Sequence, residues 1–159
     1  MAATVVFSEA NLVGEVVQDN VANINFGSID DHELTPATYP VVCGQNSYEK
    51  YLKMKFGGTF TEISNMKFWK SVGTLVTGEV IKANEITTYA TPVNTTSIQA
   101  VDAVPTDVGS AIVVHAANGD LTIGAAGYTR YICMQTQSTV STPAGAGNQK
   151  TFVFQYDEV

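Results

Sequence analysis

The chain has 159 residues, of which 45% are hydrophobic and 14% are charged, and its net charge is −7. This length fits one domain, which buries roughly 70% of its unfolded surface and needs no disulfide or metal to build a core. An acidic chain repels phosphate backbones, and its one arginine, Arg130, offers little bidentate recognition, so direct nucleic-acid binding is excluded from the expected functions.

The N-terminal residues show neither a positively charged leader nor a long apolar run, because the run over 2–7 ends at Ser8-Glu9. No stretch approaches the roughly 18 apolar residues that cross a membrane. We therefore expect synthesis in the cytoplasm without an export signal or membrane anchor. Residues 1–22 are expected to form an N-terminal arm or an edge strand, and residues 23–159 a single β-sandwich domain.

Alternating apolar side chains predict the first strands. Ile24 and Phe26 share one face of a run over 23–26, and Val76 and Val80 share one face further along the chain. The segment 47–56 allows two interpretations, a strand or a short helix with Ser47 as its N-cap. The strand interpretation, which we favour because neighbouring segments read as strands, places Leu52, Met54 and Phe56 inward and Tyr51, Lys53 and Lys55 outward.

The second half of the chain continues this pattern. The runs over 112–114 and 121–123 flank Asn118-Gly119-Asp120, and Asn-Gly is the strongest short signal for a hairpin turn. Residues 128–140 alternate throughout, 141–148 read as a flexible loop, and Phe152, Phe154 and Tyr156 share one face of a closing strand. The sequence therefore predicts an all-β fold of about 8–10 short antiparallel strands with little helix, as a β-sandwich or a jelly roll.

No catalytic constellation is recognisable in the sequence. The motifs for a nucleophilic serine, a phosphate-binding loop and a dinucleotide site are absent, so we expect no enzyme activity and no cofactor. The acidic run Asp30-Asp31-His32-Glu33 is interpreted as a solvated loop, with a cation site or a pH-sensitive contact as the alternative. His115 is expected to be a hydrogen-bonded structural residue, and Cys43 and Cys133 either two buried free thiols or a disulfide.

Positive charge is concentrated in one segment. Five of the seven lysines lie over 48–70, where the net charge is +3 while the remainder carries −10. This segment is interpreted as solvated strand faces around a core tryptophan, as a contact surface for an acidic partner or another copy, or as an aromatic platform for sugar or single-stranded nucleic acid. The candidate interaction residues are Lys50, Lys53, Lys55, Lys67, Trp69 and Lys70.

The segments 46–52, 56–61 and 63–69, together with the closing run 152–158, resemble structural proteins of tailed-bacteriophage virions. The resemblance covers about half of the chain and supplies no catalytic residues. It implies a capsid decoration or cement protein on the virion surface that binds the major capsid protein or another virion protein and assembles as a homo-oligomer, most often a trimer. The alternatives are a tail or baseplate component and a lectin-like carbohydrate-binding module that uses Trp69.

Overall fold

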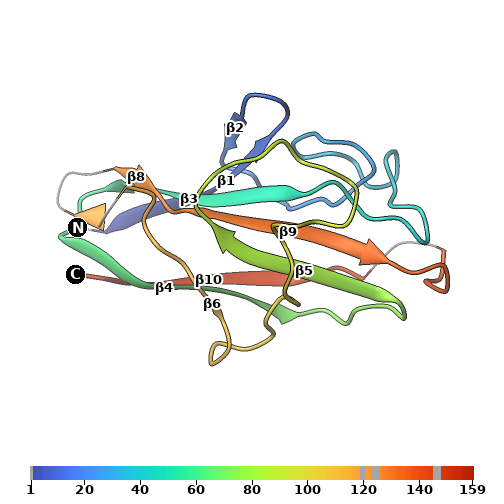
Figure 1. The fold of residues 1–159 in the computed structure, drawn as a ribbon. Coiled ribbons are helices and arrows are strands. Elements are labelled where there is room, and N and C mark those ends of the chain that lie inside the picture. Colours follow the sequence, from blue (N-terminus) through green and yellow to red (C-terminus); the bar gives the residue numbers. More distant parts are fainter. Residues whose placement is uncertain (1, 119–120, 123–125, 145–147) are drawn as a thin grey trace.

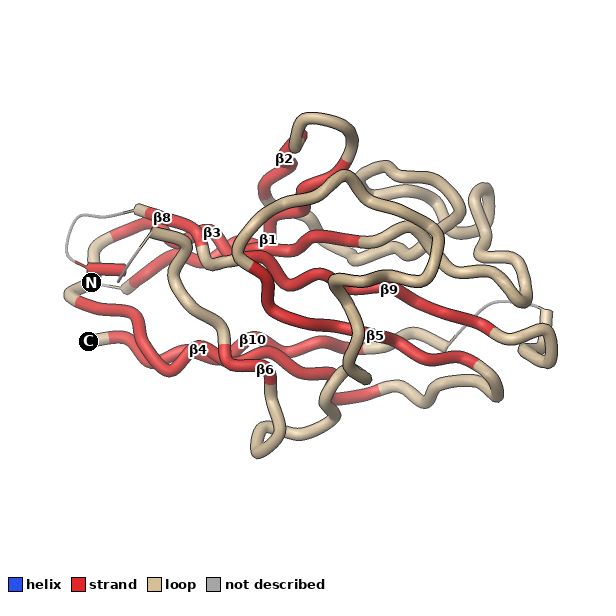
Figure 2. The backbone as a smooth tube through the Cα atoms, in the orientation of Figure 1, coloured by secondary structure: helices blue, strands red, loops and turns tan. Residues whose placement is uncertain are grey.

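A computed structural model describes residues 2–118, 121–122, 126–144 and 148–159. Within these ranges the chain forms ten strands in two antiparallel sheets that pack face to face, and none of these residues lies in a helix (Figure 1 and Figure 2). The all-β sandwich expected from the alternation is therefore confirmed.

The larger sheet, here called sheet A, runs in the order β2-β1-β3-β9-β5, with β8 paired to β3. The smaller sheet, sheet B, runs β10-β4-β6, with β7 paired to β4. The strands of sheet A are β1 (Ala3–Asn11), β2 (Val16–Asp19), β3 (Lys50–Gly58), β5 (Glu79–Ile86), β8 (Gly127–Tyr128) and β9 (Tyr131–Ser138). Those of sheet B are β4 (Glu62–Val72), β6 (Ile112–Val113), β7 (Leu121–Thr122) and β10 (Thr151–Glu158).

The main hydrophobic core lies between the inner faces of the two sheets. The expected inward side chains of β3 are fully buried there, as are two side chains of β9, and Ile63, Met66 and Phe68 of β4 are buried with them. Those of β3 and β9 are Leu52, Met54, Phe56, Ile132 and Met134. Because β10 is the edge strand of sheet B, its inward side chains Phe152, Phe154 and Tyr156 pack against this core but remain partly exposed.

A β-bulge in β4 keeps that strand in phase with the core. Lys67 pairs with Gln155 and Ser64 with Asp157, so β4 carries one more residue than β10 between these pairs. The extra residue is Asn65, whose φ of 50° lies in the left-handed region that asparagine tolerates. Its side-chain Nδ2 donates to Asp157 Oδ2 at 2.6 Å. The bulge therefore allows both Ile63 and Met66 to face inward.

The segment 47–56 contains the start of β3, so its strand interpretation is confirmed and the helix alternative is wrong. The prediction that the second face of β3 points outward is wrong for Tyr51, which is fully buried, and for Lys53, which is 8% exposed, whereas Lys55 is half-buried. Tyr51 packs in a second apolar cluster with Ala10, Ala100 and Cys133. Alternation reports the spacing of side chains along a strand, and it contains no information about loops that cover the second face.

A buried carboxylate fixes one of these covering loops, residues 87–101. Glu49 Oε2 accepts hydrogen bonds from Val93 N and from the Tyr51 hydroxyl, each at 3.2 Å. Its Oε1 accepts a hydrogen bond from Ser97 Oγ, which itself accepts one from Ala100 N at 2.7 Å. These bonds hold the loop against sheet A.

Other strands expected from the sequence differ from those in the structure. Residues 23–26 form no strand, although Ile24 and Phe26 pack against the core, and β5 begins only at Glu79. The expected hairpin around Asn118-Gly119-Asp120 falls partly outside the described residues, since 119 and 120 are not among them. Its flanking strands β6 and β7 pair with β4 instead of each other, and the chain between them crosses to sheet A, where Ala117 N donates to Tyr128 O.

The remaining expectations concern the N-terminal segment and the cysteines. Residues 1–22 contribute β1 and β2, and β1 pairs with β3 over eight consecutive positions. The two termini lie at the same end of the sandwich, where Ala3 N donates to Glu158 Oε1 at 2.8 Å (Figure 1). Cys43, partly exposed, and Cys133, buried, are both free thiols, and burial raises the pKa of Cys133 to about 12.

Candidate functional site: the β1–β2 hairpin and the lysines beneath it

The six predicted interaction residues do not form one surface. Lys50, Lys53 and Lys55 lie on β3 in sheet A, whereas Lys67, Trp69 and Lys70 lie on β4 in sheet B. Lys50 is fully buried, and Lys53 and Lys70 are each 8% exposed. Lys55, Lys67 and Trp69 are half-buried.

Each lysine of β3 pairs with a carboxylate of the β1–β2 hairpin. Lys50 Nζ lies 2.6 Å from Glu9 Oε1, and Lys53 Nζ lies 3.0 Å from Glu15 Oε1. Lys55 pairs with Asp19. A surface for an acidic partner is one of the three interpretations of the positive segment over 48–70. The carboxylates that its three β3 lysines bind belong to a hairpin of the same chain.

The Glu9–Lys50 pair is buried on both sides. Lys50 Nζ also donates to Asp31 O at 2.5 Å, and burial raises the pKa of Glu9 although the nearby Lys50 lowers it. Glu9 Oε2 and Asn11 Oδ1 have no hydrogen-bond partner among the described residues. Removing one charge of such a pair leaves the other buried without compensation, so this pair makes the position of the hairpin strongly dependent on both residues.

The two outer pairs are enclosed by tyrosines. Tyr131 donates to Glu15, and Tyr128 donates to Asp19 Oδ1 at 3.2 Å. Lys53 Nζ lies 4.6 Å from the Tyr128 ring centroid and 4.9 Å from that of Tyr131, within the range of cation–π attraction.

These contacts shift the pKa values of the two outer carboxylates. Burial alone would raise the pKa of Glu15, but its hydrogen bonds from Tyr131 and Lys53 together outweigh burial and lower it. The hydrogen bonds from Lys55 and Ser8 lower the pKa of Asp19. Both groups are therefore held in the charged form that the pairing requires.

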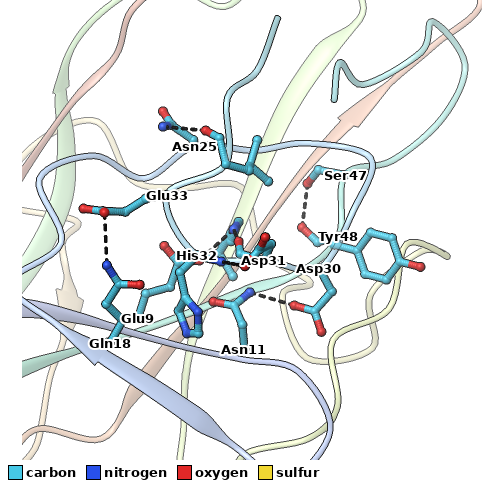
Figure 3. A network of polar contacts seen from close by, with 12 residues as sticks. Glu9, Asn11, Gln18, Asn25, Asp30, Asp31, His32, Glu33, Ser47 and Tyr48 are labelled. Atoms are coloured by element: carbon cyan, nitrogen blue, oxygen red, sulfur yellow. Dashed lines mark hydrogen bonds and ion pairs between the residues drawn. The ribbon is translucent and has the colours of Figure 1, made fainter. Parts of the chain in front are cut away.

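The acidic run over 30–33 also forms hydrogen bonds with the hairpin (Figure 3). Asp30 accepts hydrogen bonds from Asn11 Nδ2 at 2.7 Å and from Leu12 N at 2.9 Å. His32 Nε2 donates to Val16 O at 2.9 Å, and Glu33 accepts from Gln18 Nε2 at 3.0 Å. The run 30–33 is thus not only a solvated loop: it binds the hairpin through hydrogen bonds, and we call it the clamp. Throughout the described ranges, no group of three or more His, Cys, Asp or Glu residues could hold a metal ion.

The tip of the hairpin is aliphatic and exposed. We define the hairpin tip as residues 12–17, in which Val13 is 82% exposed, Val16 49%, Leu12 37% and Val17 36%. Leu12 and Glu15 have backbone φ values of 64° and 59°. These values lie in the left-handed region, which residues other than glycine and asparagine rarely adopt. Tyr89 donates to Leu12 O at 2.6 Å and thereby helps to hold this backbone in place.

Sequence reasoning missed this tip. An aliphatic run around Gly14 is equally consistent with two buried strand ends. Its side chains are exposed because β2 lies at the edge of sheet A.

The remaining candidate residues lie outside the hairpin. His115 is exposed and hydrogen-bonded to Glu85, as its Nδ1 lies 2.9 Å from Glu85 Oε2. Trp69 faces outward from sheet B, beside Val153 of β10.

No family model, curated protein or solved structure matches the chain. The fold and the hairpin therefore define its class by themselves: an all-β protein of two sheets with a clamped, projecting hairpin. Among the residues described, there is no helix long and apolar enough to cross a membrane.

Proposed function

We propose that this protein is a structural component of a tailed-bacteriophage virion, a decoration or cement protein that binds the outside of the capsid and stabilises the shell. The observation that carries the proposal is the hairpin tip, which presents four exposed aliphatic side chains on a braced backbone. Contiguous exposed apolar side chains mark interaction sites. A surface that is ordered before binding loses little conformational entropy when it binds.

The internal use of charge supports the same function. The β3 lysines and hairpin acids bind one another, so these charges stabilise the domain itself. A cement protein needs a rigid body between its contacts more than it needs a reactive cleft. Its partner in this proposal is the major capsid protein or another virion protein, and its working form is a trimer at the virion surface.

A carbohydrate-binding module is the second candidate, because Trp69 is half-buried and faces outward from sheet B. Aromatic side chains in such positions can stack on sugar rings. A tail or baseplate location is a variant of the first candidate and uses the same hairpin tip.

Particle composition tests the proposal directly. Virions of the phage that encodes the chain are purified on a density gradient and labelled with a gold-conjugated antibody against the protein. Labelling over the head is the expected result, and labelling confined to the tail supports the baseplate variant. Particles without the chain contradict both.

Two further experiments test the other parts of the proposal. A Trp69→Ala variant that folds but loses binding on a glycan array would favour the carbohydrate module. Mass photometry of the purified chain is expected to show a trimer.

A further inference from the structure

We infer that the hairpin tip docks into an apolar pocket of a different protein, and that lysine or arginine side chains surround this pocket. The inference rests on the proposed structural function and specifies the chemistry of its contact. Three independent features of the hairpin lead to it: its aliphatic tip, its bracing and the charge around it.

The aliphatic side chains are concentrated at one point. Leu12, Val13, Val16 and Val17 lie within six residues, and Val13 is the most exposed of them at 82%. A tip of this shape fits a concave pocket better than a flat surface, because a hairpin end projects from the body of the protein (Figure 1). Burying such side chains is favourable in proportion to the apolar area removed from water.

The hairpin is braced at points along its length. The Leu12 amide donates to Asp30 and the Leu12 carbonyl accepts from Tyr89. Glu15, inside the tip, binds Lys53 and Tyr131, and the carbonyl of Val16 accepts from His32. These polar groups of the tip are thus bound from within the protein, while its aliphatic side chains are exposed. Because the polar groups are already bound and the aliphatic side chains are free to make contacts, the tip favours an apolar partner surface.

The charge around the tip selects the partner. Six carboxylates lie on the hairpin and the clamp over 30–33, and the three β3 lysines neutralise Glu9, Glu15 and Asp19. The other three, Asp30, Asp31 and Glu33, are not paired with a lysine or arginine among the described residues. They form an acidic rim whose complement is basic.

The same rim disfavours two other occupants. Anionic lipid headgroups repel an acidic rim, so insertion into a membrane is not expected. A second copy carries a net charge of −7, and its β3 lysines are already bound to its own hairpin. The trimer of the proposed function is therefore expected to use another surface.

The test measures binding of the purified chain to virion particles grown without it. Val13→Ser/Val16→Ser removes aliphatic surface at positions whose backbone is not in the left-handed region. Val140→Ser is the control, because Val140 is 90% exposed in a turn after β9, outside the hairpin. The double variant is expected to weaken binding at least tenfold, with Val140→Ser unchanged. Wild-type affinity should fall as sodium chloride rises from about 0.05 to 0.5 M, because salt screens the acidic rim.

Each alternative has its own outcome. A double variant that binds like wild type overturns the inference, whereas a wild-type chain that binds no particle overturns the proposed function as well. Vesicles of phosphatidylcholine with one quarter phosphatidylglycerol should not retain the protein, and retention that Val13→Ser/Val16→Ser abolishes would assign the tip to a membrane. Sedimentation velocity should show the same oligomer for wild type and double variant, and loss of the oligomer in the variant would assign the tip to a second copy.

Discussion

Lys50 and Lys53 on β3 and Lys67 on β4 lie in contrasting surroundings, although Lys70, also on β4, is buried as well. In sheet A, Lys50 and Lys53 of β3 are buried and bound to acids of the β1–β2 hairpin. In sheet B, Lys67 of β4 is half-buried on the outward face, beside an outward Trp69. The two strands have similar composition and adjoin in the sequence. The difference comes from what surrounds each strand, since acids of the hairpin bind the lysines of β3 and the loop over 87–101 packs against the second face of sheet A.

The largest effect in this comparison is expected for the buried lysine. Lys50→Ala leaves Glu9 charged and buried, and it should lower the free energy of unfolding by about 3–5 kcal/mol. Lys67→Ala on β4 is the matched control and should change it by about 0.5 kcal/mol or less. Urea unfolding followed by circular dichroism measures both. Glu9→Leu/Lys50→Met removes both charges and should recover most of the loss; no recovery would contradict the assignment of this loss to an uncompensated charge.

Two adjacent residues of β4 compare the faces of sheet B. Phe68 is fully buried in the core, so Phe68→Ala should lower the free energy of unfolding by about 3–5 kcal/mol. Trp69 faces outward and is half-buried, so Trp69→Ala should fold and lose about 1–2 kcal/mol. Thermal unfolding of the two variants provides the measurement. Equal losses would show that the outer face of sheet B is as well covered as its inner face.

Acid should loosen the hairpin. The lowered pKa values of Glu15 and Asp19 mean that their contribution to stability is present above the ordinary carboxyl pKa of about 4 and is lost as the pH falls through the lowered values. Glu9 contributes to the pH dependence of stability with the opposite sign. Its pKa is raised in the folded protein, so its contribution to stability is lost as the pH rises. Urea midpoints between about pH 3 and 6 should therefore vary less in Glu15→Gln/Asp19→Asn and more in Glu9→Gln. Parallel profiles for all three proteins would refute this account.

The smallest effect concerns the backbone of the hairpin tip. Leu12 has a φ of 64°, which glycine adopts without a steric penalty, so Leu12→Gly should raise the free energy of unfolding by about 0.5–1 kcal/mol. Val13→Gly is the control next to it and should be destabilising, since Val13 has no positive φ. A stabilising Leu12→Gly that also weakens particle binding would show that the leucine serves the contact and not the fold.

The sequence allowed the inner faces of the sandwich to be predicted because the strongest alternation lies there. Spacing alone assigns Leu52, Met54 and Phe56 to the inward face, and all three are buried in the main core. The second face of sheet A could not be predicted in this way. Its cover depends on contacts such as Ser97 to Glu49, which join residues 48 positions apart and leave no local pattern.

The candidate site shows the same limit. Composition identified the lysine-rich segment, but its function depends on β1 lying beside β3, a pairing between residues about fifty positions apart. Once that pairing is known, Glu9, Glu15 and Asp19 are obvious partners for the lysines. The hairpin tip was missed because aliphatic residues in a short run normally indicate burial, and only the edge position of β2 reverses that reading.

The hydrogen bond from Ala3 to Glu158 has a practical consequence for engineering. Because both chain ends leave the sandwich at one end, a short glycine–serine linker could join them without crossing either sheet. New ends could then be opened in the turn over 139–142, which produces a circular permutant. For the same reason, a protein fused to either end of the original chain would be displayed from the same side of the domain.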